Sequence, residues 1–263
     1  MTRPVSLAMY DPGNGATDRL WSALRPHLAD AGLSLLPDRL APAEQLEKAW
    51  LDPNLLLAQT CGYPLRHTLD GRVRYVGTPI YHVDGTMGAD YRSAIIVRAT
   101  DRARSLEDLR GRRAAFNSIT SQSGYNAFRA AIAPLARDGR FFGSSHETGS
   151  HAASLRAVIA GEVDVAAIDP VSLALAAEDL RAAVKVIGWT DAAPGLPFVT
   201  SFGSSDSELA ALREALDEFL NQSTEPVRSE FRLAGFEVLD AHAYDVILDM
   251  ERGAIARSYP TLN

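Results

Sequence analysis

The sequence predicts an α/β fold with two lobes, built by a chain that leaves the first lobe, forms the second and returns. Short apolar runs alternate with segments of helical periodicity, which is typical of α/β proteins with a largely parallel sheet. At residues 86–89 and 191–197 the alternating pattern is interrupted by segments that contain small or turn-forming residues. The stretch between these two segments is long enough for its own βα unit. The chain has 263 residues, of which 46% are hydrophobic, so it can bury one large core or two modest ones. Two passages between lobes make a hinge, and ligands usually bind in the cleft beside one.

Each expected strand is a short apolar run bounded by polar or turn-forming residues. The run at 113–116, for example, ends directly at a hydroxyl-rich turn. In chain order, strands are expected at residues 5–10, 33–36, 54–59, 73–76, 94–98, 113–116, 163–168, 184–188 and 198–201.

Helices are expected where apolar residues recur at helical spacing. The helix near Ser207 places its apolar residues on one face, and the helix near Ser150 has a start signal at Ser150 and a stop signal at Gly161. In chain order, the expected helices begin near Thr17, Ala43, Leu106, Ser123, Ser150, Pro170, Ser207, Glu225 and Ala241.

Charge and cysteine content exclude several classes of function. The formal net charge is −7 and the sequence has no basic stripe, which argues against nucleic-acid binding. A small anion remains compatible, because a helix terminus acts locally whatever the net charge. Cys61 is the only cysteine, so neither an internal disulfide nor a multi-cysteine metal site can form. We expect no metal and no other cofactor.

The N-terminal segment leads from Met1 and Pro4 straight into a strand-like run. That run is too short and too quickly polar for a secretory signal. The sequence has no run of about eighteen apolar residues, so no direct membrane insertion is expected. As written, the chain is expected to be cytoplasmic, or a mature form whose leader was replaced by Met.

Residues 117–129 are the most informative segment. They follow the expected strand at 113–116 and open a helical pattern. A strand that ends in a hydroxyl-rich turn and becomes a helix directs backbone N–H groups and Ser hydroxyls at one point, which suits an anion. The alternative is that Ser121 or Ser123 only caps the helix.

Further candidates also follow expected strands or open expected helices. His151 begins a helix after Gly149 and Ser150, and Asp169 ends an apolar run at the edge where α/β proteins bind ligands. Each has a plainer interpretation: His151 as a surface residue, and Asp169 as a cap before Pro170. The remaining candidates are tyrosines at strand ends or turns, which often pack half-buried without binding anything: Tyr10, Tyr63 and Tyr91.

Several of these runs together resemble the phosphate/phosphonate-type solute-binding proteins of ABC transporters, which have the type II periplasmic-binding-protein fold. The resemblance covers roughly residues 5 to 200. It implies two lobes, 1–88 plus 194–263 and 89–193, each a mixed, mostly parallel sheet flanked by helices. The runs that carry it, in order, are 55–64, 91–98, 106–111, 121–126, 149–154 and 161–169.

The resemblance implies roles for the candidate residues. Ser121, Gln122 and Ser123 would cradle a phosphonate, phosphate or phosphate ester, with His151 as a further donor and Asp169 facing the far end of the ligand. Tyr91 resembles a tyrosine that lines the cleft, and Tyr63 stands at a Gly-Pro-Tyr turn of the family with its residues in another order. Gln122 departs from the family, which has Thr there. The resemblance also implies membrane subunits of an ABC transporter as partners and a periplasmic location, although the family's secretion signal is absent.

An enzyme is the alternative. Ser, His and Asp are all present, but no Gly-x-Ser-x-Gly elbow occurs. Cys61 with His67 or His151 could form a thiol nucleophile, whereas a single Cys in an apolar run is more often a packing residue. Related folds also serve in thiamine-pyrimidine synthesis or as ligand sensors, and a cytosolic location would favour these roles.

Overall fold

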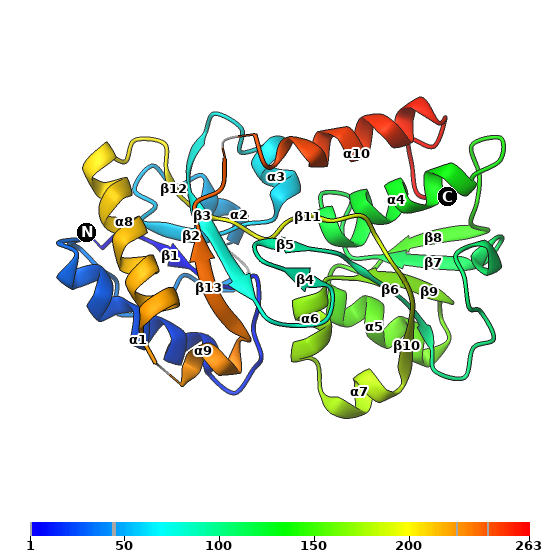
Figure 1. Cartoon of the computed structure of the whole chain (residues 1–263), viewed down its shortest axis with the longest axis horizontal. Coiled ribbons are helices and arrows are strands. Elements are labelled where there is room, and N and C mark those ends of the chain that lie inside the picture. Colours follow the sequence, from blue (N-terminus) through cyan, green and yellow to red (C-terminus); the bar gives the residue numbers. More distant parts are fainter. Residues whose placement is uncertain (1, 44–45, 225, 241) are drawn as a thin grey trace. The chain divides into compact units, whose positions relative to one another are not determined.

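The computed structural model describes residues 2–43, 46–224, 226–240 and 242–263 (Figure 1). The chain divides into two compact units. Unit 1 comprises Met1–His82, Met87–Ala89 and Pro194–Ala243, and unit 2 comprises Val83–Thr86, Asp90–Ala193 and Tyr244–Asn263. Each unit is described below by itself.

The core of unit 1 is a five-stranded mixed sheet in the order β1-β2-β12-β3-β13. Strands β1 and β2 are parallel, β12 is antiparallel to both β2 and β3, and β13 is antiparallel to β3. Strands β1, β2 and β3 therefore end at the same edge of the sheet. The bounds are β1 Val5–Ser6, β2 Leu57–Gln59, β3 Val73–Tyr81, β12 Phe198–Ser201 and β13 Leu233–Glu237.

Helices cover both faces of this sheet. On one face, α1 (Ala16–Asp30) packs beside α8 (Asp206–Asp217), which begins with a capping box formed by Ser205 and Glu208. A π-helical turn, η5 (Glu218–Gln222), follows α8, and α9 (Val227–Glu230) lies beside α1. On the other face, Trp50 from α2 (Leu46–Trp50) packs against Ala58 and Val199. A further short helix, α3 (Gly62–Arg66), follows β2.

The core of unit 2 is a second mixed sheet, in the order β10-β6-β9-β7-β8. Strand β7 is parallel to both of its neighbours, β9 and β8, whereas β6 is antiparallel to β9 and β10. The bounds are β6 Ala94–Arg98, β7 Arg113–Phe116, β8 Ser144–Glu147, β9 Val165–Ile168 and β10 Val184–Trp189. A short third sheet has the order β11-β5-β4, with the bounds β11 Ala193–Pro194, β5 Asp90–Tyr91 and β4 Thr86–Met87.

The two faces of the unit 2 sheet bury separate apolar clusters. Helix α5 (His151–Ala160) packs on one face through Leu155 and Val158. The other face is covered by a continuous helical segment (Figure 1). That segment consists of the π-helical turn η3 (Gln122–Asn126), then α4 (Ala127–Ile132) and then η4 (Ala133–Leu135). The remaining short helices of unit 2 are η2 (Glu107–Leu109), α6 (Pro170–Leu175) and α7 (Glu178–Ala182).

The last helix, α10 (Asp245–Ala256), belongs to unit 2, whereas the sequence placed residues 194–263 together in the first lobe. Its inner face buries Ile247, Met250 and Ala254. Beyond the helix, Tyr259 and Leu262 are almost fully buried in the cluster around Phe128. The apolar stripe of a helix predicts that the helix packs on a core, but it does not show which core. Here the residues after α10, Tyr259 and Leu262, are buried in the core of unit 2, so α10 packs there too.

Most of the other expected elements are confirmed. Strands β6, β7 and β12 have the expected bounds, and α6 begins at Pro170 as expected. The expected strand at 33–36 is wrong, because Leu35 has φ of 59°, which is incompatible with an extended chain. Antiparallel pairs are more frequent than expected, although the mixed α/β class is confirmed. The expected helix starts at Glu225 and Ala241 lie outside the described residues.

Within the described part of the chain, no helix is both long enough and apolar enough to cross a bilayer.

Candidate functional site

Several candidate residues meet at one edge of the unit 2 sheet. Strands β7, β8 and β9 are mutually parallel and end at Phe116, Glu147 and Ile168, so the segments that follow them begin at the same edge. Strand β6 runs the other way, and its first residue, Ala94, pairs with Ile168. The edge therefore gathers residues 117–123, 148–151, Asp169 and 91–93. Carboxyl ends of parallel strands are where open α/β sheets bind ligands.

The helix that follows β7 begins at this edge. Ser121 is its N-cap, with an extended backbone, and its hydroxyl accepts a hydrogen bond from the Gly124 N–H at 3.0 Å. The next turn is π-helical: the Asn126 N–H donates to the Ser121 carbonyl at 3.0 Å. Short π-helical turns are often found at functional sites. The capping interpretation of Ser121 is thus confirmed, and it is compatible with a binding role because a cap occupies only one N–H.

His151 lies against this helix start. Its Nε2 is 2.8 Å from Ser123 Oγ, and Ser123 Oγ is 3.4 Å from Ser121 Oγ. The turn that carries His151 is held to the end of β7 by backbone hydrogen bonds, including one from the Gly149 N–H to the Asn117 carbonyl at 2.9 Å. Ser150 caps α5 by accepting from the Ala153 N–H at 3.1 Å. Two helix starts and three polar side chains therefore meet in one place, as the sequence predicted for Ser121, Ser123 and His151.

Gly124 makes this approach possible. A Cβ atom on Gly124 would lie 1.9 Å from Asn117 Oδ1 and 3.1 Å from His151 Cε1. Only glycine lets Asn117 and His151 close over the first turn of the helix. Neither Gly124 nor Asn117 is predicted as a site residue from the sequence, because their importance depends on contacts between distant segments.

The side chain of Gln122 points away from the two serines. Its amide oxygen accepts from Asn126 Nδ2 at 2.8 Å, and its amide nitrogen donates to Met250 Sδ at 3.2 Å. Asn126 Nδ2 also donates to the Ile247 carbonyl at 2.9 Å, so this face of the helix is tied to α10. The amide of Gln122 therefore does not stand in for the hydroxyl of the Thr that the family has there. The part of Gln122 that could contact an anion is therefore its backbone.

Asp169 is almost fully buried at the carboxyl end of β9. Its Oδ1 accepts from the backbone N–H groups of Val171 and Ser172 at 2.9 and 3.0 Å, which caps α6. The capping interpretation is confirmed here as well. Ser93 and Asp169 flank the paired residues Ala94 and Ile168 on adjacent strands. Ser93, which the sequence analysis did not single out, is also buried, and so is Tyr91 two residues before it.

Three buried polar atoms at this edge have no hydrogen-bond partner among the described residues: Ser93 Oγ, Asn117 Oδ1 and His151 Nδ1. Each such atom costs free energy, about 1–3 kcal/mol, and native proteins contain few of them. Burial lowers the pKa of His151 from its ordinary value of 6.5 to about 4, so its imidazole is neutral at pH 7. The edge therefore combines uncharged polar groups with the carboxylate of Asp169.

The other two tyrosine candidates, Tyr10 and Tyr63, lie in unit 1. Tyr10 follows β1 and packs edge-on against Tyr81, with ring centroids 5.1 Å apart. Gln59, the last residue of β2, donates from Nε2 to the Tyr81 hydroxyl at 3.1 Å. Tyr63 lies in α3 and stacks on His67, with ring centroids 4.1 Å apart. The edge of unit 1 at which β1, β2 and β3 end is thus rich in aromatic rings.

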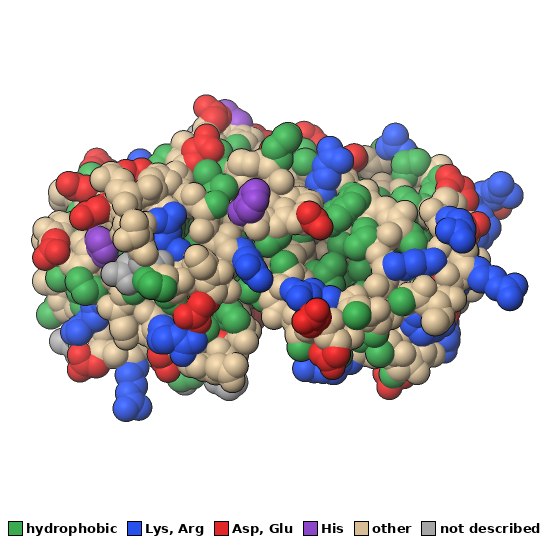
Figure 2. All heavy atoms as spheres, turned by 60° about the horizontal axis from the view of Figure 1, so that its bottom comes forward, with side chains coloured by type: hydrophobic (Ala, Val, Ile, Leu, Met, Phe, Trp, Pro, Cys, Tyr) green, Lys and Arg blue, Asp and Glu red, His purple; other side chains and the backbone are tan. Residues whose placement is uncertain are grey.

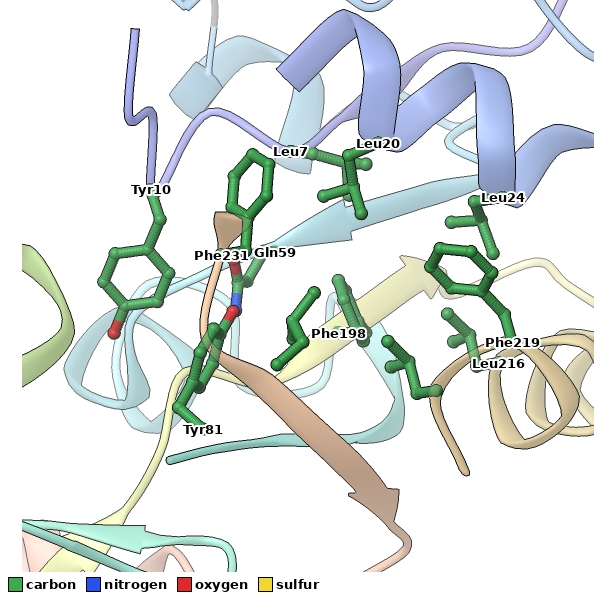
Figure 3. A pocket seen from close by; sticks show the side chains of 12 residues that line it. Leu7, Tyr10, Leu20, Leu24, Gln59, Tyr81, Phe198, Leu216, Phe219 and Phe231 are labelled. Carbon is green, nitrogen blue, oxygen red and sulfur yellow. The ribbon is translucent and has the colours of Figure 1, made fainter. Parts of the chain in front are cut away.

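A small cavity lies behind Tyr10 and Tyr81 inside unit 1 (Figure 3). Its volume is about 20 Å³, which is room for roughly one water molecule. Gln59 is the only amide side chain in a lining that is otherwise apolar or aromatic, so the cavity is a packing defect of the core and too small for an organic ligand. The lining residues are Leu7, Tyr10, Leu20, Leu24, Gln59, Tyr81, Phe198, Leu216, Phe219, Leu220, Phe231 and Leu233.

Surface charge agrees with the sequence analysis. Figure 2 shows acidic and basic side chains interspersed on the face that it presents, without a continuous basic stripe. Among the residues that the structure describes, no group of three or more His, Cys, Asp or Glu is placed to hold a metal ion.

Comparisons with known proteins are consistent with this geometry. Residues 46–244 match the model of a family described as the periplasmic substrate-binding protein of phosphonate ABC transporters. None of the curated proteins matches the chain.

Solved structures share the fold. A binding-protein component of an ABC phosphonate transporter from Pseudomonas aeruginosa has a TM-score of 0.76 at 19% identity, over 97% of this chain and 89% of that one. PhnD1 from Prochlorococcus marinus in complex with methylphosphonate has a TM-score of 0.73 at 14% identity, over 95% and 97% of the two chains. A protein from Xanthomonas citri bound to ATP has a TM-score of 0.67 at 16% identity, over 97% of each chain.

Proposed function

This chain belongs to the family of periplasmic substrate-binding proteins of phosphonate ABC transporters, and on that premise we propose that it binds a small phosphonate-like or phosphate-like anion at the unit 2 edge. The members of this family bind their substrate and are not enzymes, so the alternative of a thiol- or hydroxyl-dependent enzyme is set aside. Cys61 is buried, which suits the packing role considered from sequence.

The observation that carries the proposal is the convergence of Ser121, Ser123 and His151 on one helix start. The 2.8 Å contact between Ser123 Oγ and His151 Nε2 joins two segments that follow neighbouring parallel strands, and Ser121 Oγ lies 3.4 Å from Ser123 Oγ. An anion placed there would receive hydroxyl and backbone N–H donors without requiring a cation. Ser93 and Asn117 extend the same polar edge.

The expected affinity follows from known contributions. A helix N-terminus contributes about 0.3–1 kcal/mol towards a nearby anion, and up to about 2 kcal/mol in a partly buried site. Hydrogen bonds to a charged group contribute roughly 1.5–3 kcal/mol each. Micromolar binding needs about 8 kcal/mol, so four or five such contacts are enough.

The other candidate residues have roles within the same proposal. Asp169, whose Oδ1 caps α6, would face the far end of the ligand, where a carboxylate suits an amine. Tyr91 would add a contact from unit 2, and the candidates Tyr10 and Tyr63 lie in unit 1. The membrane subunits of a phosphonate transporter are the proposed partners. A periplasmic location is what the family indicates, and export of this chain is part of the proposal.

The test is a double substitution, Ser121→Ala with Ser123→Ala, measured by isothermal titration with methylphosphonate. Loss of two charge-assisted hydrogen bonds predicts at least a tenfold weaker affinity. Ser144→Ala is a matched control, because Ser144 Oγ also contacts an imidazole, His146 Nε2 at 3.2 Å, but at the start of β8 and therefore at the opposite edge. Equal affinity in the double variant and the control would remove this site from the proposal.

A further inference from the structure

Unit 1 has a second pocket, formed by helix α1 and the loop that follows it. Its volume is about 370 Å³, which lies within the range of pockets that hold small organic molecules. We propose that this pocket binds a small carboxylate with an apolar body, and that Arg25 and Trp21 recognise these two parts. The proposal goes beyond anion binding at the unit 2 edge and does not depend on it, because the lining residues of the pocket belong to unit 1.

One wall of the pocket is a single stripe of α1. Ser22, Arg25, Pro26 and Ala29 follow one another at spacings of three, one and three residues, so they share one face of the helix. The leucines that α1 buries are not part of this stripe. The stripe therefore does not serve the packing of α1 on the core of unit 1.

The loop supplies the other wall through Leu36 and Asp38. It is tied to the helix by Trp21, whose Nε1 donates to the Pro37 carbonyl at 3.2 Å. Trp21 is almost fully buried and also lines the pocket, so it is a fixed aromatic surface beside the stripe. The pocket is thus formed before any ligand arrives, which reduces the entropic cost of binding.

Three unfavourable local features meet at this pocket. Pro26 lies inside α1, where it has no N–H to donate to the Ser22 carbonyl. Leu35, which precedes the lining residue Leu36, has φ of 59° although it is not glycine. Arg25 Nε is shielded from solvent and has no acceptor among the described residues. Local rules are most often broken at functional sites, so the three features together favour a function over a plain solvated helix face.

Other arginines of the chain show how a guanidinium group holds a carboxylate. Arg19 donates to Glu230 from Nε at 3.3 Å and from Nη2 at 2.6 Å. Arg113 donates to Asp164 from the same two atoms, at 3.1 and 2.8 Å. In each pair one carboxylate takes both donors on one edge of the guanidinium group, which is the strong, two-point form of this contact.

In Arg25 the same edge is only half used. Nη2 donates to Asp38 Oδ1 at 3.1 Å, whereas Nε has no acceptor in the described part of the chain. The Asp38 side chain is 91% exposed, so its ion pair with Arg25 is screened by solvent and easily exchanged. The Arg25 side chain is itself 43% exposed and has room to turn its Nε–H towards an incoming group.

A ligand carboxylate that replaces Asp38 would take both donors of this edge. The apolar body of the ligand would then lie against Trp21 and Leu36, and a single negative charge suits the site because Asp38 remains close by. The ligand class is therefore a monocarboxylate with an aromatic or aliphatic body.

The test uses phenylacetate as the probe and the indole N–H signals in ¹H–¹⁵N spectra as the readout. Trp21 lines the pocket, whereas Trp50 packs on the other face of the unit 1 sheet and Trp189 lies in β10. We expect the Trp21 signal, assigned with Trp21→Phe, to shift and to saturate with a Kd of roughly 1 mM, as a ligand of this size allows. The signals of Trp50 and Trp189 should stay in place. Absence of a saturable shift of Trp21 well above that concentration would overturn the proposal.

Substitutions separate the two-point contact from a general attraction of charge. Arg25→Gln removes the cation, and we expect phenylacetate to bind at least about tenfold more weakly. Phenylacetamide, which has the same shape without the charge, should lose at least about tenfold on the wild-type protein. Asp38→Asn removes the competing carboxylate and should strengthen phenylacetate binding by about threefold. The matched control is Arg39→Gln, because Arg39 is an exposed cation of the same loop that does not line the pocket, and its effect should stay within about twofold.

Equal losses for Arg25→Gln and Arg39→Gln would overturn the proposal, because net charge rather than the pocket would then attract the probe. Weaker binding by Asp38→Asn would overturn it too, since Asp38 would then belong to the site instead of competing for it. Thermal unfolding of each variant separates a change in affinity from a change in folding. Methylphosphonate titration of the wild-type protein tests the proposed function alone, so a failure there would leave the phenylacetate result standing.

Discussion

The two units carry different chemistry at the same kind of sheet edge. In unit 1, strands β1, β2 and β3 end at an edge lined by the paired rings of Tyr10 and Tyr81. In unit 2, strands β7, β8 and β9 end among hydroxyl groups and an imidazole. Both sheets direct strand ends to one edge, so the fold alone does not determine what binds there. The residues placed at the edge do.

The helices that follow the strands differ in the same way. After β2, the short helix α3 begins at Gly62, and the side chain of its N-cap residue, Cys61, makes no capping hydrogen bond to the helix. After β7, the helix that begins at Gln122 is capped by Ser121 and continues through α4. A longer, capped helix whose start faces polar groups suits an anion, and the aromatic edge of unit 1 suits an apolar or organic group.

The largest effect that distinguishes the two units is expected from glycine substitutions. Gly124→Ala places a Cβ 1.9 Å from Asn117 Oδ1, so Asn117 and His151 must move away from the helix start. We expect methylphosphonate affinity to fall by about a hundredfold or more, because the donors lose their alignment. Isothermal titration measures this loss.

Gly77→Ala is the matched control in unit 1. Its Cβ would lie 2.2 Å from the ring of Phe236, so the substitution overpacks the core and should cost about 1–3 kcal/mol of folding stability. Methylphosphonate affinity of the folded protein should stay within about twofold of wild type. If Gly77→Ala weakens binding as much as Gly124→Ala does, the difference between the two edges is not what determines anion binding.

The second effect is acid sensitivity, which we expect from unit 2. The pKa of His151 is about 4 in the folded protein and near 6.5 in the unfolded chain, so the unfolded state binds more protons between these values. Folding stability therefore falls as pH drops from about 6.5 to 4, by at most about 3 kcal/mol from this residue. His151→Gln should reduce the difference between urea unfolding free energies at pH 7 and pH 5.

His146→Gln provides the comparison for that experiment, because His146 is exposed on β8. We expect this variant to keep the wild-type difference between pH 7 and pH 5. An unchanged difference in His151→Gln would show that burial of this imidazole does not cause the acid sensitivity.

Local signals made part of the site predictable from sequence. Ser121 and Asp169 each stand where an apolar run meets a helix start, His151 opens a helix after Gly149 and Ser150, and all three lie at the expected edge. A strand-turn-helix pattern is written in consecutive residues, so it is visible in one sequence. The roles of Gly124 and Asn117 are not visible there, because they arise only when the turn at 148–151 packs on the turn at 117–121.

The missed and misplaced elements have physical reasons too. Strand β8 was not predicted because its sequence, Ser144–Glu147, is polar and at most half-buried, and it is held by pairing with β7 rather than by an apolar face. The direction of the Gln122 amide could not be predicted, since its partner Met250 lies in α10, which the sequence assigned to the other lobe. Both depend on tertiary pairing.

The smallest effect is expected at the aromatic edge of unit 1. Tyr81→Phe removes the hydroxyl that accepts from Gln59 Nε2 at 3.1 Å but keeps the ring that packs on Tyr10. Because Gln59 Nε2 also donates to the Leu196 carbonyl at 3.1 Å, the amide keeps a partner, and the loss of stability should be about 1 kcal/mol or less. Affinity for methylphosphonate should change by less than about twofold, because the proposed anion site lies at the edge of unit 2. Urea unfolding and isothermal titration of wild type and Tyr81→Phe measure the two effects, and a loss of affinity as large as that of Gly124→Ala would show that anion binding is not confined to the edge of unit 2.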